Sequence, residues 1–315
     1  MFSELFPPKS TWNVEDVPDL TGQTILVTGG SSGIGKEMSR VLVAKNARVY
    51  IASRSEHKSL EAIEEIKAST GKTEVFFLKL DLGDLRAVRE AAEEFMRKES
   101  ELHVLVNNGG VMSPPVKELT VQGYDLQFGT NVLGHFFFTS LLLPILRRTA
   151  TNPHNEAHRV RIVVLSSSAH MFASEGILWE TLQKGDVATK ARENKGHRWL
   201  YGQSKLGNIL IAKELARRFG DQSIVTTSVH PGSIVSDMQR HLNPIAVWIM
   251  RKLLGYPLSM GIITPLFAAT APETLGMNGE YITCWARRSI PRGKGCDQAL
   301  SARLWDWCEE QVKGF

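Results

Sequence analysis

One stretch decides the fold: Thr24-Ile25-Leu26-Val27-Thr28, followed by Gly29-Gly30-Ser31-Ser32-Gly33-Ile34-Gly35. Residues 24–28 are a short apolar run of strand formers, and residues 36–45 carry helical periodicity. Between them, glycines let the backbone turn tightly and approach a ligand closely. The N-terminus of the following helix then offers free N–H groups and a positive dipole end to a phosphate. We therefore expect a dinucleotide-binding turn here, in preference to a plain strand–helix connection.

Strand and helix patterns alternate along the chain after this turn. Further strands are expected at 47–52, 73–80, 102–106, 160–165 and 224–229. Helices are expected at 36–45, 57–69, 84–99, 123–148 and 199–219. Repeats at this spacing predict the α/β class: one doubly wound domain whose central parallel sheet carries helices on both faces.

The segments outside this alternation set the expected domain limits. Residues 1–20 should form an extended arm, because Pro7, Pro8 and Pro18 prevent a long helix, and its aromatic residues should lie against the domain. The domain itself is expected over residues 21–290. Residues 291–315 then form a tail, in which 300–312 has the pattern of an amphipathic helix that caps the domain or forms a contact between copies.

Composition excludes several classes of protein. Hydrophobic residues make up 43% and charged residues 22% of the 315, and the net charge of +4 is dispersed, so no nucleic-acid footprint is visible. Cys284, Cys296 and Cys308 lack metal-ligand or disulfide spacing, which indicates a reducing compartment and no metal site. No secretory pattern and no run of 18 uncharged apolar residues occurs. A soluble, cytoplasmic protein is expected.

A second motif carries potential acid–base chemistry: Tyr201-Gly202-Gln203-Ser204-Lys205. Residues four apart lie on one helical face, so an ammonium would stand beside a phenol. The ammonium would stabilise the phenolate and bring the tyrosine pKa towards neutral pH, where it can exchange a proton with a hydroxyl or carbonyl. Alone, the motif is better explained as a packed aromatic residue and a solvated lysine, because chance often produces this spacing, so the case depends on the rest of the chain.

The end of the second expected strand bears on nucleotide preference. A fold that binds NAD usually has an acidic residue there, which holds the ribose hydroxyls. Here Ser53 and Arg54 take that place, so no carboxylate repels a 2′-phosphate and a guanidinium can clamp one. NADP is therefore expected over NAD, although Arg54 could instead stack on the adenine of either cofactor.

Five features in this order resemble the short-chain dehydrogenase/reductase family: the glycine loop, Asn107-Asn108-Gly109-Gly110, Asn131, Ser166-Ser167-Ser168 and Tyr201-x-x-x-Lys205. The resemblance spans about residues 20–285. It is strongest to the branch that contains retinol dehydrogenases and their fungal relatives, through residues 131–136, His170, residues 204–208 and His230-Pro231-Gly232. It implies a Rossmann-type fold and an NADP(H)-dependent oxidoreductase that acts on CH–OH groups.

The resemblance implies cofactor-binding roles for residues along the carboxyl edge of the sheet. Thr28 would help to shape the phosphate loop, and the loop residues Gly29, Ser31, Ser32, Gly33, Ile34 and Gly35 would bind the cofactor. Asp81 and Leu82 would bind adenine, Asn107 would brace the central strands, and Gly109 would replace the family's usual alanine. Pro231 and Gly232 would border the nicotinamide, and Ser236 would bind its carboxamide.

The resemblance also implies a catalytic set. Ser167, with Ser168 as the alternative, would orient the substrate oxygen, Tyr201 would exchange its proton, and Lys205 would lower the tyrosine pKa and hold the ribose. Asn131 would anchor a proton-relaying water; its alternative is a core asparagine bonded to backbone. His170 and His230 are expected to be structural.

Two segments should determine the substrate. The charged run 184–197, between serine and tyrosine, is expected to be a solvated loop. Residues 237–263 are apolar around Arg251 and Lys252 and should form a lid over a lipophilic or aromatic carbonyl substrate. A peripheral membrane contact is the alternative for this segment.

Three functions therefore remain. The leading one is carbonyl–alcohol interconversion by a carbonyl reductase or alcohol dehydrogenase, in a homodimer or homotetramer as in many relatives. The others are a catalytically idle NADP-sensing protein and a membrane-associated retinoid- or steroid-type dehydrogenase.

Overall fold

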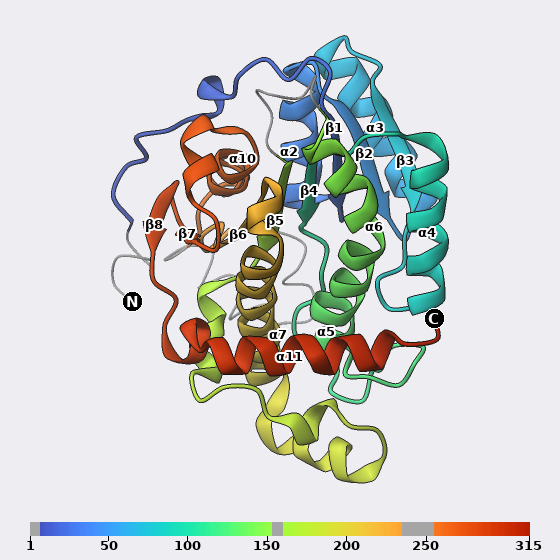
Figure 1. The fold of residues 1–315 in the computed structure, drawn as a ribbon, viewed down its shortest axis with the longest axis vertical. Coiled ribbons are helices and arrows are strands. Elements are labelled where there is room, and N and C mark those ends of the chain that lie inside the picture. The colour runs from blue at the N-terminus through green and yellow to red at the C-terminus, as the bar shows by residue number, and fades with distance from the viewer. Residues whose placement is uncertain (1–6, 153–159, 235–254) are drawn as a thin grey trace.

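The structure is a computed structural model that describes residues 7–152, 160–234 and 255–315. Within this part of the chain, eight strands form one sheet in the order β3-β2-β1-β4-β5-β6-β7-β8 (Figure 1). All neighbours are parallel except β8, which runs antiparallel to β7. The strands are β1 (Thr24–Thr28), β2 (Arg48–Ser53), β3 (Val75–Lys79), β4 (Val104–Asn107), β5 (Val160–Leu165), β6 (Ile224–Val229), β7 (Tyr281–Thr283) and β8 (Arg287–Ser289). The expected α/β fold with its central parallel sheet is confirmed.

Helices cover both faces of this sheet. The α-helices are α2 (Gly33–Ala44), α3 (Glu56–Thr70), α4 (Leu85–Lys98), α5 (Leu126–Phe128), α6 (His135–Ala150), α7 (Asp186–Phe219), α9 (Leu258–Gly261), α10 (Ile263–Thr270) and α11 (Gln298–Val312). A π-helical segment, Gly129–Gly134, joins α5 to α6. Short 3₁₀ turns lie at Val14–Asp16, Ser168–Ala173, Trp179–Leu182, Gly220–Gln222, Pro272–Gly276 and Gly293–Cys296.

Side chains alternate between two hydrophobic cores along each central strand, as the period of two requires. In β1, Leu26 joins the core made with α4, α6, α7 and α11. Ile25 and Val27 join the core made with α2, α3 and α10. Both cores are built from side chains that are almost fully buried, so the sheet is fixed from either face. Its carboxyl edge, where the sequence motifs gather, is correspondingly rigid.

The expected bounds of β1, β5 and β6 are identical to those in the structure, and the bounds of most other elements agree to within three residues. Three differences between expectation and structure remain. The helix expected at 123–148 begins at Leu126 and contains the π segment. The charged run 184–197 is not a loop but the first part of α7, which bends at Gly196 (φ 74°, ψ 161°) and extends at the bottom of Figure 1. The strands β7 and β8 were not expected.

A buried arginine explains why the charged run is helical. Arg192 is 1% exposed and donates hydrogen bonds to the carbonyls of Thr181 and Gln183, at 3.1 and 3.3 Å, and to Thr189 Oγ1 at 3.1 Å. These bonds fasten the helix to the preceding 3₁₀ turn. A pattern of apolar residues does not reveal such an anchor.

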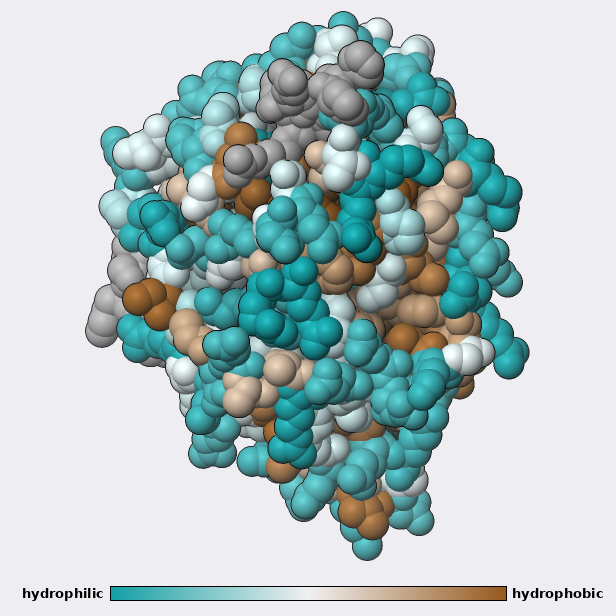
Figure 2. Space-filling model, in the orientation of Figure 1, coloured by the Kyte–Doolittle hydropathy of each residue, from teal (hydrophilic) through white to brown (hydrophobic). Residues whose placement is uncertain are grey.

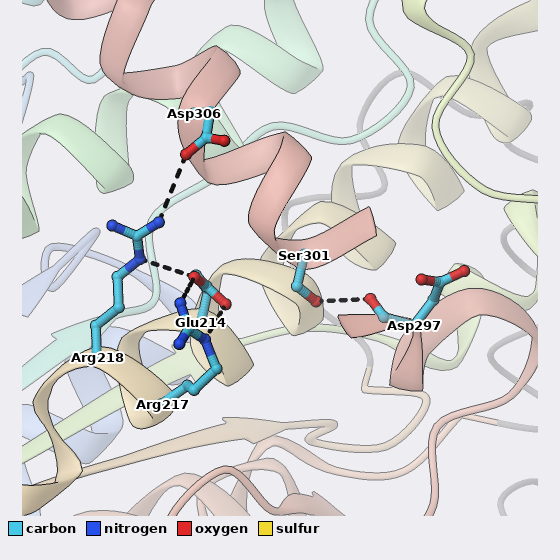
Figure 3. Close-up of polar contacts among 6 residues, drawn as sticks. All are labelled: Glu214, Arg217, Arg218, Asp297, Ser301 and Asp306. Carbon is cyan, nitrogen blue, oxygen red and sulfur yellow. Dashed lines mark hydrogen bonds and ion pairs between the residues drawn. The ribbon is translucent and has the colours of Figure 1, made fainter. Parts of the chain in front are cut away.

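The helix α11 caps the domain across α6 and α7 (Figure 1). Its Trp305 is 3% exposed and packs edge-on against Phe136, with ring centroids 4.9 Å apart. At the end of α7, the carboxylate of Glu214 accepts hydrogen bonds from Arg217 and Arg218, and Arg218 reaches Asp306 of α11 at 3.5 Å (Figure 3). Hydrophilic residues predominate on the outer face of this region (Figure 2). Of the two roles expected for the tail helix, the structure displays the cap.

The N-terminal arm lies against the domain where it is described. Trp12 is 6% exposed and meets Phe267 of α10 edge-on, with centroids 5.5 Å apart. The expected contact of Trp12 is thereby confirmed, whereas Phe2 and Phe6 lie outside the described residues.

One helical stretch, Leu126–Ala150, is long and apolar enough to cross a membrane. However, 78% of its most apolar window is buried inside the protein, against the sheet and α4. Its composition is therefore that of a core helix.

Candidate active site

The motifs converge because parallel strands end at the same edge of the sheet. In register, Val27 of β1 pairs with Val106 of β4, and Leu165 of β5 pairs with Val229 of β6. The strand order reverses between β1 and β4, since β2 and β3 follow on one side and β5 and β6 on the other, and ligands bind at such a point in open α/β sheets. A cavity of about 470 Å³ opens along this edge.

The glycine loop forms one end of the cavity. Gly29 (φ 66°) and Gly33 (φ 52°) adopt left-handed conformations that favour glycine. A Cβ at Gly35 would lie 2.6 Å from Asn108 Nδ2, which itself donates to the carbonyl of Thr28 at 2.7 Å. Asn108 therefore braces the loop from the end of β4. The predicted loop residues Gly29, Ser32, Gly33, Ile34 and Gly35 line the cavity, and Ser31 does not.

Thr28, at the end of β1, connects the glycine loop to the residues that follow β4 through hydrogen bonds of its hydroxyl. Its Oγ1 accepts hydrogen bonds from the N–H groups of Asn108 and Gly109, at 2.9 and 2.8 Å, and lies 2.8 Å from His135 Nε2. His135 Nδ1 lies 3.0 Å from the carbonyl of Asn131, an acceptor, so Nδ1 carries the proton and Nε2 accepts from the threonine hydroxyl. Burial lowers the pKa of His135 to about 4, and Lys205 adds to the effect. The ring is therefore neutral.

Of the remaining predicted cofactor residues, Gly109 lines the cavity, whereas Arg54, Asp81, Leu82 and Asn107 do not. Arg54 is exposed and makes no hydrogen bond or ion pair with the described residues. Asp81 Oδ1 accepts from the Gly83 N–H at 2.9 Å. Leu82 is 8% exposed, and a Cβ added to Gly109 would lie 3.0 Å from its Cδ1. Asn107 donates to Thr139 Oγ1 at 2.8 Å, and its buried Oδ1 has no hydrogen-bond partner among the described residues.

Ser167, Tyr201 and Lys205 meet at the other end of the cavity. Removal of water raises the pKa of Tyr201 above its ordinary value of 10.0, and a side-chain hydrogen bond with Ser167 opposes that rise. The pKa is therefore raised, where the sequence argument expected Lys205 to lower it. The physical reason is that the removal of water outweighs any effect of the Lys205 ammonium, which lies 5.7 Å from the ring centre and donates to the Leu165 carbonyl at 2.9 Å. Burial also lowers the pKa of Lys205 to about 8.

The three adjacent serines have different surroundings. Ser166 is buried and donates to the Lys205 carbonyl at 2.7 Å. Ser167 bonds Tyr201 and accepts from the Ala169 N–H at 3.2 Å, which caps the 3₁₀ turn that Ser168 begins. The geometry therefore favours Ser167 over Ser168 as the serine that acts with the tyrosine.

Asn131 lies in the π-helical segment and is completely buried. Its Oδ1 accepts from the Val111 N–H at 2.8 Å, and its Nδ2 donates to the Val111 carbonyl and to Ser204 Oγ, both at 3.0 Å. This side chain thus binds the backbone of the loop after β4 through Val111 and reaches α7 through the Ser204 hydroxyl. That pattern matches the alternative stated for Asn131, and a water-relay role stays a prediction.

Pro231 and Gly232 border the cavity after β6, as expected for the nicotinamide end. Gly232 has φ 94°, and a Cβ there would lie 2.6 Å from the Trp285 ring. Ser236 and residues 237–254 of the expected lid, with the suggested membrane contact, lie outside the described residues. The two ends that flank that segment are joined, because the Tyr256 N–H donates to the Ser233 carbonyl at 2.9 Å.

The two histidines near the site have structural partners. His170 Nδ1 lies 2.7 Å from the Ser167 carbonyl, and its Nε2 accepts from the Arg292 N–H at 3.1 Å. His230 Nδ1 accepts from the Gly232 N–H at 3.3 Å. Across residues 7–152, 160–234 and 255–315, no group of three or more His, Cys, Asp or Glu side chains is arranged to hold a metal ion.

The sequence did not single out Asn108, His135 or Arg198 as site residues, although each contacts a predicted one or lines the cavity. A helical-face argument could have found two of them. His135 follows Asn131 by four residues, and Arg198 precedes Tyr201 by three.

Comparison with known proteins agrees with this geometry. Residues 23–178 match the family model of the short chain dehydrogenases. A short-chain dehydrogenase/reductase from Armillaria gallica is 48% identical over 99% of this chain and 97% of its own, and retinol dehydrogenase 12 of Mus musculus is 34% identical over 91% and 85%.

Among solved structures, Pseudomonas aeruginosa RhlG in its active-site complex with NADP superposes with a TM-score of 0.64, at 25% identity over 84% of this chain and 95% of its own. An uncharacterized protein from Mycobacterium paratuberculosis reaches a TM-score of 0.70, at 28% identity over 96% and 98%. With its sheet, its glycine loop and its serine, tyrosine and lysine at one edge, this chain belongs to the short-chain dehydrogenase/reductase family of oxidoreductases, in the retinol-dehydrogenase-like branch.

Proposed function

We propose that this protein is an NADP(H)-dependent oxidoreductase that interconverts a carbonyl and an alcohol on a lipophilic or aromatic small molecule. The observation that carries the proposal is the meeting of Ser167, Tyr201 and Lys205 at one end of a cavity whose other end is the glycine loop. A protein that only senses NADP has no need of a proton-transferring set at the second end.

The residues present fit a dinucleotide. The left-handed glycines and the start of α2 form a cradle that a Cβ would fill, and its N–H groups face a phosphate. Arg54, free of other partners in the described chain, supports a preference for a 2′-phosphate, as does the complex of RhlG with NADP. Lys205 would donate to the ribose hydroxyls. When bound, the cofactor supplies or accepts the hydride.

The protein's own residues handle the proton. Ser167 donates a hydrogen bond to the substrate oxygen and holds it beside Tyr201. Because its pKa is raised, Tyr201 carries its proton at neutral pH, which is the state needed to protonate the oxygen as a carbonyl is reduced. Reduction therefore uses the phenol, and oxidation requires the phenolate, which the Ser167 hydrogen bond stabilises.

Met112, Phe172 and Ile234 add apolar side chains to the cavity lining. These side chains and the likeness to a retinol dehydrogenase support a lipophilic or aromatic substrate. A cytoplasmic location is proposed on the sequence alone.

The test is NADPH oxidation by the purified protein with a panel of apolar aldehydes and ketones, with NADH in parallel. We expect turnover with NADPH, and a fall of about 10²- to 10⁴-fold in kcat for Tyr201→Phe, the usual contribution of a positioned acid or base. Binding of NADPH by Tyr201→Phe, followed by fluorescence, controls for folding. Tight binding without turnover by the unmodified protein would favour the sensor instead.

A further inference from the structure

The substrate end of the cavity contains one charged side chain that the proposed mechanism does not use. Arg198 lines the cavity together with Phe172 and Tyr201. It lies on α7 three residues before Tyr201 and beyond the bend at Gly196, so both residues share a helical face, with Cβ atoms about 5–6 Å apart. The two side chains therefore leave the helix about one turn apart, and both reach the cavity.

Arg198 has no partner that would explain its position. It is exposed and makes no hydrogen bond, ion pair or ring contact with the described residues. The other arginines of α7 do have partners. Arg192 is buried and donates three hydrogen bonds, and Arg217 and Arg218 both form ion pairs with Glu214. Arg198 alone among these four faces the cavity.

No carboxylate of the described chain lines the cavity to neutralise this charge. The other lining groups that could carry a positive charge are Lys205 and His230. Lys205 is 3% exposed and bound to the Leu165 carbonyl, and burial holds the pKa of His230 at about 3, so His230 is neutral. The potential at the substrate end is therefore positive, and low-dielectric walls concentrate it.

We propose that the substrate carries a carboxylate, which Arg198 binds while the carbonyl meets Ser167 and Tyr201. A planar guanidinium matches a carboxylate through two parallel N–H donors. A phosphate dianion would call for a second cation, and Lys205 is already engaged. The substrate class is thus an amphipathic oxo-acid, with an apolar body against Phe172, Met112 and Ile234. This inference rests on the proposed reductase function and narrows its substrate.

The kinetic test compares an acid with its neutral ester. The probes are para- and meta-formylbenzoate and their methyl esters, with NADPH as reductant. A hydrogen-bonded ion pair of this kind predicts that kcat/KM for the better acid exceeds that of its ester by about tenfold or more. Arg198→Gln should remove this advantage and leave the esters within about twofold, whereas Arg198→Lys should keep part of it.

Lys190→Gln is the matched control, because it removes an exposed charge from the same helix outside the cavity lining. It should leave both acid and ester unchanged. Equal turnover of acids and esters by the unmodified protein, or an equal loss for both in Arg198→Gln, would overturn the inference while ester turnover still upholds the reductase.

If no aldehyde is turned over, a binding measurement tests the role of Arg198 independently of the reductase function. Benzoate should raise the melting temperature of the NADPH complex more than methyl benzoate does, and Arg198→Gln should abolish the difference. Equal effects of the two compounds on the unmodified protein would refute the role of Arg198 whatever the activity. Failure to turn over any carbonyl, with the benzoate difference intact, would count against the reductase alone.

Discussion

The ammonium of Lys205 lies 5.7 Å from the centre of the Tyr201 ring and is held there by the carbonyl of Leu165, 2.9 Å away. Asn208 donates to the same carbonyl at 2.8 Å. Leu165, the last residue of β5, stands two residues before Ser167 and thus holds Lys205 in place. Strand β5 and helix α7 therefore position Ser167, Tyr201 and Lys205 together.

This arrangement predicts how activity depends on pH. Burial lowers the pKa of Lys205 from 10.5 to about 8, so its positive charge is present below pH 8 and is lost above it. We expect kcat/KM for carbonyl reduction to fall as the pH rises through about 8, measured with a neutral aldehyde. Lys205→Arg, which keeps its charge, should be less active but lack this fall. The same fall in Lys205→Arg would assign it to another group.

Nucleotide preference should depend on Arg54. Arg54→Asp replaces a free cation with a carboxylate beside the expected 2′-phosphate, so kcat/KM with NADPH should drop at least tenfold and that with NADH should not. Steady-state kinetics with both cofactors measures the ratio. The exposed Lys58 offers a control, since Lys58→Gln should change the ratio less. An unaltered ratio in Arg54→Asp would mean that Arg54 does not contact the phosphate.

Two glycines of the cofactor edge should respond differently to alanine. A Cβ at Gly35 would lie 2.6 Å from Asn108 Nδ2 and would also meet the Gly29 backbone, so Gly35→Ala should cost about 1–3 kcal/mol of stability and weaken NADPH binding. At Gly109 the nearest atom is the end of Leu82, at 3.0 Å, which can move. Gly109→Ala should change either quantity little. Denaturant unfolding and NADPH titration test both, and equal effects would contradict the loop geometry.

His135 should make the protein sensitive to acid. The unfolded chain binds this proton near pH 6.5 and the folded protein only near 4, so the unfolded state takes up more protons as the pH falls between these values. The free energy of unfolding should therefore fall by on the order of 3 kcal/mol from pH 6.5 to 4 through this residue. His135→Gln should flatten the profile of unfolding free energy against pH. The exposed His57 is the control, and an unchanged profile in His135→Gln would refute the assignment.

Removal of Trp305 should destabilise the whole domain. Its indole packs on Phe136 and Phe219 and lies beneath the Arg218 guanidinium, so Trp305→Ala should cost about 3–5 kcal/mol, measured by denaturant unfolding. Trp307→Ala, at a less buried neighbouring position, should cost less. Comparable losses would show that α11 contributes as a whole and not through this ring.

Local patterns were sufficient to predict the sheet and the location of the site. The apolar runs of β1, β5 and β6 are each bounded by polar or glycine residues, and their parallel order brings Thr28, Asn107 and Ser167 to one edge. The retinol-dehydrogenase-like branch was likewise predicted from motifs, and the relatives confirm it.

Features that depend on long-range contacts were not predictable. The helix over the charged run needs Arg192 to reach the carbonyls of Thr181 and Gln183. The sign of the shift in the Tyr201 pKa depends on how much water the fold removes, which spacing does not give. The strands β7 and β8 are three residues each, too short to show a period.

The packing of α11 on α6 and α7 also bears on synthesis of the protein. Phe136 and Phe219 leave the ribosome well before Trp305, so the face that α11 covers stays exposed to water while the intervening chain is made. Such surface attracts other hydrophobic chains. The nascent protein is therefore expected to be most prone to aggregation before residues 298–312 emerge and cover this apolar face.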